Sequence, residues 1–109
     1  MERINTRKVG NKLEYYIVDR LKKVLNDPTI RRTKNSGAST ELADIICKQF
    51  IIEAKKRNTE SITIKESVWN KLLAEVPLGS TRIPLYVLEN KNAKRWVVLD
   101  LEDFLRSIK

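Results

Sequence analysis

Apolar residues recur at helical spacing in three stretches of the chain, which predicts three helices. The first covers residues 11–25 and ends at Asn26-Asp27-Pro28, a combination that stops helices. The second covers residues 63–76, where Thr63 and Glu66 have the spacing of a capping box. The third follows Asp100, which is placed to cap it. Its apolar face consists of Leu101, Phe104, Leu105 and Ile108.

Short apolar runs between these helices predict five strands, at residues 29–33, 43–47, 50–54, 83–88 and 95–99. Residues 34–41, rich in small polar residues, predict a loop. Only Lys48-Gln49 separates the second run from the third, so these two form a predicted β-hairpin. The resulting order is α-β-β-β-α-β-β-α within a single domain, residues 1–109. This order predicts a mixed α/β fold, a small mixed central sheet flanked by helices.

One acidic residue lies inside the apolar stripe of the first predicted helix. On a helical wheel of about 100° per residue, Glu14 falls about 100° from Leu13, between Leu21 and Leu25. A carboxylate that faces a core is costly unless it is paired or bound to a metal. Two interpretations are open: Glu14 faces solvent at the boundary or pairs with an arginine, or it belongs to a functional site.

The predicted hairpin places two further acids opposite each other. With a two-residue turn at Lys48-Gln49, Asp44 pairs with Glu53 on the neighbouring strand, with Cβ atoms about 5 Å apart. Like charges so placed are destabilising unless a group such as a divalent cation compensates them. Lys55 shares this face of the strand because it lies two residues after Glu53. A second acid-x-Lys tripeptide, Glu89-Asn90-Lys91, has no opposing acid and predicts an ordinary surface turn.

Composition narrows the chemistry that these acids support. The chain has no histidine and one cysteine. A Ser-His-Asp triad, a His-ligated zinc site and an internal disulfide are therefore excluded. Any reaction must rest on carboxylates, lysines, hydroxyls and a hard metal ion held by oxygen.

The net charge of +8 is concentrated in residues 1–35, which hold ten basic and four acidic residues. Such a basic segment beside an acidic site indicates a surface that faces a polyanion, and the alternative is a basic, solvated face. The charged N-terminus predicts no secretory signal, and the short apolar runs predict no membrane span. Trp69 and Trp96 are predicted as core residues. A cytoplasmic protein is expected.

The combination of a helix acid, an Asp and a Glu-x-Lys strand resembles the PD-(D/E)xK nuclease superfamily. Within it, the chain looks most similar to the Holliday-junction resolvases of archaea and phages. The residues that carry this resemblance are Gly10, Glu14, Arg32, Ser36-Gly37, Asp44 and Ile52-Glu53-Ala54-Lys55. The chain departs from the pattern at Ala43-Asp44, where the family has Pro-Asp, and in a longer segment between Arg32 and Asp44.

The resemblance implies a restriction-endonuclease-like core and a structure-selective DNA endonuclease that resolves four-way junctions in recombination and repair. It implies a homodimer in a prokaryotic, archaeal or phage-infected cell, with Mg²⁺ as cofactor and Mn²⁺ as a substitute. The implied catalytic residues are Glu14, Ser36, Asp44, Glu53 and Lys55. The implied metal ligands are Asp44, Glu53, the Ala54 carbonyl and Glu14.

Basic residues that flank these acids are the predicted contacts to the DNA backbone. They are Arg7, Lys8, Lys12, Arg31, Arg32, Lys34, Lys56 and Arg57. Two alternatives to a resolvase are open: another repair or restriction-type nuclease of the same superfamily, and a nucleic-acid-binding protein without catalytic activity.

Overall fold

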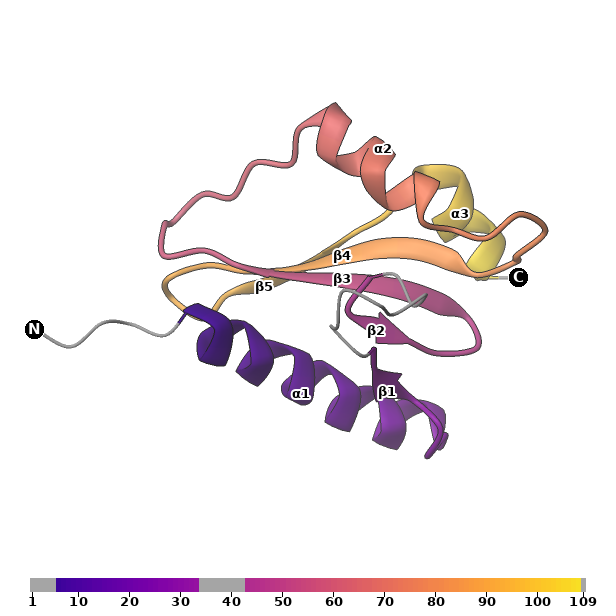
Figure 1. Ribbon diagram of the computed structural model, residues 1–109, viewed down its shortest axis with the longest axis horizontal. Coiled ribbons are helices and arrows are strands. Elements are labelled where there is room, and N and C mark those ends of the chain that lie inside the picture. The colour runs from indigo at the N-terminus through magenta and orange to yellow at the C-terminus, as the bar shows by residue number, and fades with distance from the viewer. Residues whose placement is uncertain (1–5, 34–42, 109) are drawn as a thin grey trace, which may run out of the picture.

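Three helices and five strands follow one another in the predicted order, α-β-β-β-α-β-β-α. The computed structural model describes residues 6–33 and 43–108, with side chains from residue 12 onward. Figure 1 shows α1 (Thr6–Leu25) on one side of the central sheet and α2 (Glu66–Ala74) on the other. The last helix, α3 (Leu101–Ser107), follows the final strand. The predicted mixed α/β fold is confirmed.

The sheet has the strand order β1-β2-β3-β4-β5. Its strands are β1 (Arg31–Arg32), β2 (Ile45–Ile46), β3 (Phe50–Lys56), β4 (Ile83–Glu89) and β5 (Arg95–Val98). Strands β3 and β4 are parallel because the chain crosses over through α2 between them, and the other neighbours are antiparallel. The sheet is therefore mixed, as predicted.

The hairpin of β2 and β3 has the predicted register. Ile45 pairs with Ile52, and the Cys47 N–H donates to the Phe50 carbonyl at 3.2 Å, which closes a two-residue turn. Strand β2 is shorter than the predicted run over residues 43–47. Asp44 therefore lies just before the strand, although its N–H still bonds the Ile52 carbonyl at 3.0 Å.

Alternation along β3 separates two cores, one on each face of the sheet. Ile52 belongs to the cluster that includes the apolar stripe of α1, whereas Ile51 packs in a second cluster with Leu72 of α2. Because side chains alternate along a strand, Glu53 and Lys55 lie on the same face as Ile51. The predicted acidic face of the hairpin is thus the face that α2 covers.

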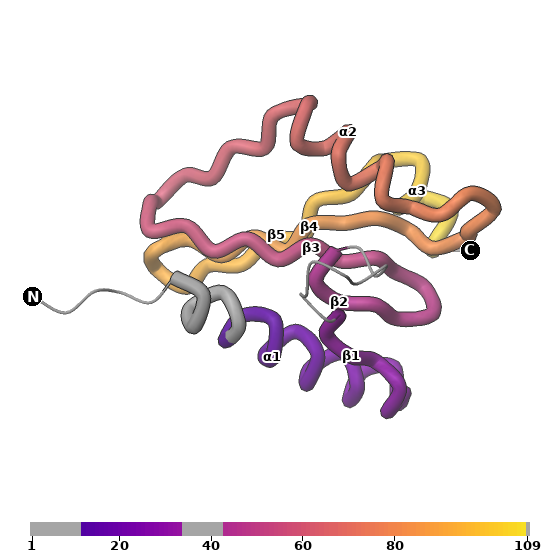
Figure 2. The backbone as a smooth tube through the Cα atoms, viewed as in Figure 1, coloured from indigo at the N-terminus to yellow at the C-terminus, as the bar shows by residue number. Residues whose placement is uncertain are grey.

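Two helix starts differ from the prediction. Helix α1 begins at Thr6 rather than near Asn11. The predicted capping box at the start of α2 is wrong, because the N-cap is Lys65, which is extended and gives no side-chain cap. The apolar residues Ile62 and Ile64 pack on the α2-side core from the segment before the helix, which explains why the apolar pattern extended too far. Figure 2 shows this long connection from β3 to α2.

The C-terminal part of the chain follows the prediction more closely. Asp100 caps α3, since its Oδ1 accepts from the N–H groups of Glu102 at 2.9 Å and Asp103 at 3.2 Å. Trp69 is partly buried in the α2-side core, as predicted. The core prediction for Trp96 is wrong: 44% of this residue is exposed because β5 is an edge strand. No helix among the described residues is long and apolar enough to cross a membrane.

Candidate active site

Asp44 is fixed by the backbone on both of its sides. Its N–H bonds β3, and its carbonyl accepts from the Thr33 N–H at 2.9 Å. The preceding residue, Ala43, has a positive φ of 67°, and the Thr33 hydroxyl donates to its carbonyl at 2.6 Å. A left-handed conformation at a residue with a side chain is unfavourable, so these bonds hold it in place. The position of Asp44 is therefore specified by its surroundings.

The Asp44 carboxylate points towards β3. Its Oδ2 accepts a hydrogen bond from the Ala54 N–H at 2.8 Å. Burial raises the pKa of Asp44, and this outweighs the hydrogen bonds from Ala54 and Glu53 and the charges of Arg32 and Lys55, which lower it. The resemblance implies the Ala54 carbonyl as a metal ligand, and the structure shows in addition that the Ala54 N–H orients Asp44.

Glu53 lies against Asp44 in an environment that disfavours two negative charges. Burial, the charges of Asp44 and Glu75, and the hydrogen bond with Asp44 together raise the pKa of Glu53 to about 8. Lys55 opposes this shift but does not cancel it. The two carboxyl groups thus share a proton at neutral pH when no cation is bound, which is the behaviour expected of closely opposed acids. The two opposed acids predicted from the hairpin register are present.

Lys55 forms no ion pair with any described residue. Its Nζ lies 5.6 Å from the ring centre of Tyr86. Tyr86 is the parallel-strand partner of Glu53, is 2% exposed, and donates its hydroxyl to the Val68 carbonyl at 3.1 Å. The ring of Trp69 lies 5.8 Å from that of Tyr86. The aromatic rings of Tyr86 and Trp69 therefore lie beside the two acids and Lys55.

Glu14 is buried, as its place in the apolar stripe predicts, and it pairs with an arginine. The Arg32 Nε donates to Glu14 Oε1 at 2.9 Å, and the guanidinium of Arg32 lies over the Tyr15 ring at 4.5 Å. Burial raises the pKa of Glu14, the Arg32 hydrogen bond opposes this, and the charge of Asp44 adds to the increase. Glu14 is therefore close enough to Asp44 to interact with it, with Arg32 beside both.

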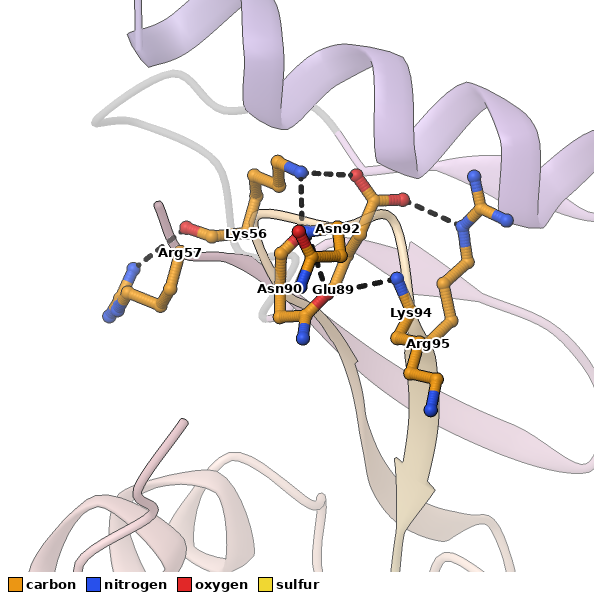
Figure 3. Close-up of polar contacts among 7 residues, drawn as sticks. All are labelled: Lys56, Arg57, Glu89, Asn90, Asn92, Lys94 and Arg95. Atoms are coloured by element: carbon orange, nitrogen blue, oxygen red, sulfur yellow. Dashed lines mark hydrogen bonds and ion pairs between the residues drawn. The ribbon is translucent and has the colours of Figure 1, made fainter. Parts of the chain in front are cut away.

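The second acid-x-Lys tripeptide forms a polar network rather than the ordinary surface turn that was predicted (Figure 3). Glu89 binds Lys56 at 2.9 Å and Arg95 at 2.6 Å. Burial raises the pKa of Glu89, but the bonds and charges of these two cations lower it by more, so it lies below its ordinary value. Asn90 is 2% exposed, and its Oδ1 accepts from the backbone N–H groups of Asn92 and Lys94, each at 2.9 Å. Lys91 is exposed at the turn, as predicted, but Glu89 and Asn90 are not, because Lys56 of β3 and Arg95 of β5 bind Glu89 and the Asn90 amide donates to the Glu60 carbonyl at 3.0 Å.

Some of the residues predicted to contact phosphates already bind other groups of the protein, and others are exposed. The Lys56 ammonium also donates to the Asn90 carbonyl at 2.8 Å, so it belongs to the network of Figure 3. Arg57 and Lys12 are exposed. Arg31 is exposed as well, and its Nη1 donates to the Arg32 carbonyl at 3.4 Å. The side chains of Arg7 and Lys8, and all of Lys34 and Ser36, lie outside the described residues.

Sequence reasoning missed two residues of the site, Tyr86 and Glu75. Tyr86 reaches Glu53 only through the parallel pairing of β3 with β4, which no local pattern reveals. Glu75 was detectable, since it lies three residues after Leu72 and so falls in the apolar stripe of the second helix. The same signal singled out Glu14.

The donor set suits a hard cation, because Asp44 and Glu53 offer carboxylate oxygens and the site lacks soft ligands. Among the described residues, no three acids or cysteines come together as a ready-made metal centre. A cation here would therefore complete its shell with water or with substrate oxygens, as Mg²⁺ ordinarily does. The chain matches no protein-family model, no curated protein and no solved structure.

Proposed function

We propose that this protein is a Mg²⁺-dependent DNA endonuclease of the PD-(D/E)xK kind that resolves four-way junctions. One observation carries the proposal: Asp44 and Glu53 face each other with a raised pKa of about 8 at Glu53, while Lys55 beside them has no described ion-pair partner. Two neighbouring acids, and an ammonium without a described ion-pair partner, contribute little to the stability of the fold. The same groups are well placed to bind a cation and a phosphate.

Asp44 and Glu53 would hold the cation, with the Ala54 carbonyl as a further oxygen donor. When bound, the cation would lower the pKa of the attacking water and stabilise charge on the phosphate. Its charge would also remove the repulsion between the two carboxylates, so both would be ionised in the loaded enzyme. The Ala54 N–H would keep Asp44 oriented throughout, through the 2.8 Å bond to Oδ2.

Lys55 would neutralise the developing charge on the scissile phosphate or orient the attacking water. Neither role requires it to change its charge, and the absence of a described ion pair leaves its ammonium available to a phosphate oxygen. Glu14 would act from the other side of Asp44, through a water or a second cation, while Arg32 holds its carboxylate. Ser36 is proposed, from the resemblance, to bond a phosphate near the cut.

The exposed basic residues Lys12, Arg31 and Arg57 would bind the DNA backbone on the flanks of the site, with Arg7, Lys8 and Lys34 nearby in the sequence. Such contacts position DNA without reading its bases. Symmetric cleavage of a junction needs two active sites at a fixed spacing, so we further propose a homodimer that acts in DNA recombination and repair inside the cell.

The test is cleavage of a labelled four-way junction, a duplex of the same sequence and a single strand, each with and without Mg²⁺. The proposal expects Mg²⁺-dependent cutting that favours the junction, abolished by Glu53→Gln with little change in DNA affinity. Glu60→Gln, an exposed acid on the β3–α2 connection, is the matched control and should cut normally.

Equal cutting of the duplex would favour a repair or restriction-type nuclease of the same superfamily. Tight, EDTA-insensitive binding without any cutting would reject the enzyme and leave a nucleic-acid-binding protein. Activity that persists in Glu53→Gln from a clean preparation would show that the site is elsewhere.

A further inference from the structure

Glu75 lies at the end of α2, against the face of the sheet that carries Glu53. It is the C-cap residue of the helix, and its N–H donates to the Leu72 carbonyl at 3.0 Å. Leu72 is 1% exposed and packs with Tyr86 in the core on this face. The backbone of Glu75 is therefore fixed relative to the sheet.

The carboxylate of Glu75 is placed where folding alone disfavours it. The side chain is half-buried, and its Oε2 is the one buried side-chain oxygen without a hydrogen-bond partner among the described residues. An unsatisfied buried oxygen costs stability, and a native protein that keeps one calls for an explanation such as a bound water or ion. A negative charge at a helix C-terminus is also disfavoured by the helix dipole.

Glu75 lies next to the candidate site. Leu72 and Val76, on either side of Glu75 in the sequence, pack in the same cluster as Tyr86, and Tyr86 is the β4 partner of Glu53, so the end of α2 lies over the strands that carry the acids. No described cation pairs with it. Four separate features thus agree: a fixed backbone, an orphan oxygen, an unfavourable helix end and proximity to a second acid. A positive charge between Glu53 and Glu75 would offset the orphan oxygen, the unfavourable helix end and the repulsion between the two acids.

We propose that Glu75 is a positioning residue of the cation site, whose Oε2 accepts a hydrogen bond from a hydration water of the cation held by Asp44 and Glu53. This inference rests on the proposed function. A role through water follows from two observations: the described acids form no ready-made group of three ligands, and Mg²⁺ keeps several of its waters in protein sites. Partners of this outer kind typically change metal affinity by about tenfold to a hundredfold.

The experiment measures Mn²⁺ binding to the full chain, by calorimetry and by the spectrum of the free ion, without DNA. Glu75→Gln keeps the size of the side chain and removes the charge, and Glu60→Gln is the matched surface control. We expect Glu75→Gln to bind Mn²⁺ about tenfold to a hundredfold more weakly, with Glu60→Gln at the wild-type value. Junction cleavage by Glu75→Gln should need more Mg²⁺ but approach the wild-type rate at saturation.

If Glu75 only repelled Glu53, Glu75→Gln would change the Mn²⁺ affinity in the opposite direction. Its removal would ease ionisation of Glu53, so Glu75→Gln would bind Mn²⁺ as tightly as wild type or more tightly, and that result would overturn the inference. If Glu75→Gln lacks the wild-type circular dichroism spectrum, Glu75→Ala is judged by the same criterion. Wild-type protein that binds no Mn²⁺ would reject the proposed function as well, whereas normal wild-type cutting with unchanged affinity in Glu75→Gln rejects this inference alone.

Discussion

The ammonium of Lys55 lies against the ring of Tyr86, with Nζ 5.6 Å from the ring centre. The two residues come from neighbouring parallel strands, and Tyr86 is held in turn by its hydroxyl bond to the Val68 carbonyl. A ring face attracts a cation without neutralising it, in contrast to a carboxylate. This contact explains how Lys55 is positioned beside two acids without a described ion pair, and in the proposed function its charge acts on a phosphate.

Tyr86→Leu should therefore impair cleavage more than DNA binding. Loss of the ring removes the surface that orients the ammonium, so we expect the cleavage rate at saturating Mg²⁺ to fall about tenfold, equivalent to roughly 1.4 kcal/mol. Tyr86→Phe keeps the ring and should retain most of the rate. The measurement is single-turnover cleavage of the preferred DNA. Equal loss in both variants, tracking their loss of stability, would show that the ring only supports the fold.

The raised pKa of Glu53 predicts how stability depends on pH in metal-free buffer. Glu53 titrates near 8 in the folded chain and near its ordinary value of 4.5 when unfolded, so between these values the folded state holds an extra proton. Glu53 should therefore lower the free energy of unfolding as pH rises from about 5 to 8, by at most about 1.4 kcal/mol per pH unit. Asp44, whose pKa is also raised, acts in the same direction.

Urea denaturation at several pH values in EDTA measures this slope. Glu53→Gln should largely abolish it, whereas Glu60→Gln should keep it. An unfolding free energy that rises with pH over this range in the wild type would contradict the assignment of the shared proton.

Much of this site could be predicted from local sequence because it is built from a hairpin. A two-residue turn fixes the register, and alternation then places Glu53 and Lys55 on one face. Glu14 was detectable because helical periodicity exposes a misplaced acid. The contacts from β4 and α2 could not be predicted, because they depend on which strand becomes the parallel neighbour of β3. The Glu89 network was missed for the same reason, since Lys56 reaches Glu89 across the parallel β3–β4 pair.

Glu89→Gln should destabilise the fold. Only 13% of the Glu89 side chain is exposed, and it holds both Lys56 and Arg95, so loss of its charge leaves two partly buried cations without their partner. Hydrogen bonds to charged groups contribute about 1.5–3 kcal/mol, and we expect a loss of about 2 kcal/mol in urea denaturation. Glu102→Gln, on the exposed side of α3, should change stability by less than about 0.5 kcal/mol. Similar values for the two variants would show that the network contributes little.

Arg32→Gln should be markedly more harmful to stability than the same change at Arg20, which is exposed on α1. It leaves the Glu14 carboxylate, whose side chain is 9% exposed, buried beside Asp44 without its cation. Removing one partner of such a pair costs up to about 3 kcal/mol, and the double variant with Glu14→Gln should regain most of it. Thermal and urea denaturation of the three proteins test this. No recovery in the double variant would mean that Arg32 acts through contacts other than Glu14.

DNA binding should depend on Lys12 through charge alone. Lys12 is exposed on α1 in the basic N-terminal third of the chain, whereas Lys71 is exposed on α2 across the sheet (Figure 1). If Lys12 contacts a phosphate, Lys12→Gln should weaken binding to all DNA sequences alike and reduce the slope of log affinity against log salt by about one. Lys71→Gln should leave the slope unchanged. Binding isotherms at four salt concentrations in Ca²⁺ measure both slopes. A smaller slope in Lys71→Gln and an unaltered one in Lys12→Gln would show that the DNA backbone contacts Lys71 on α2 and not Lys12 on α1.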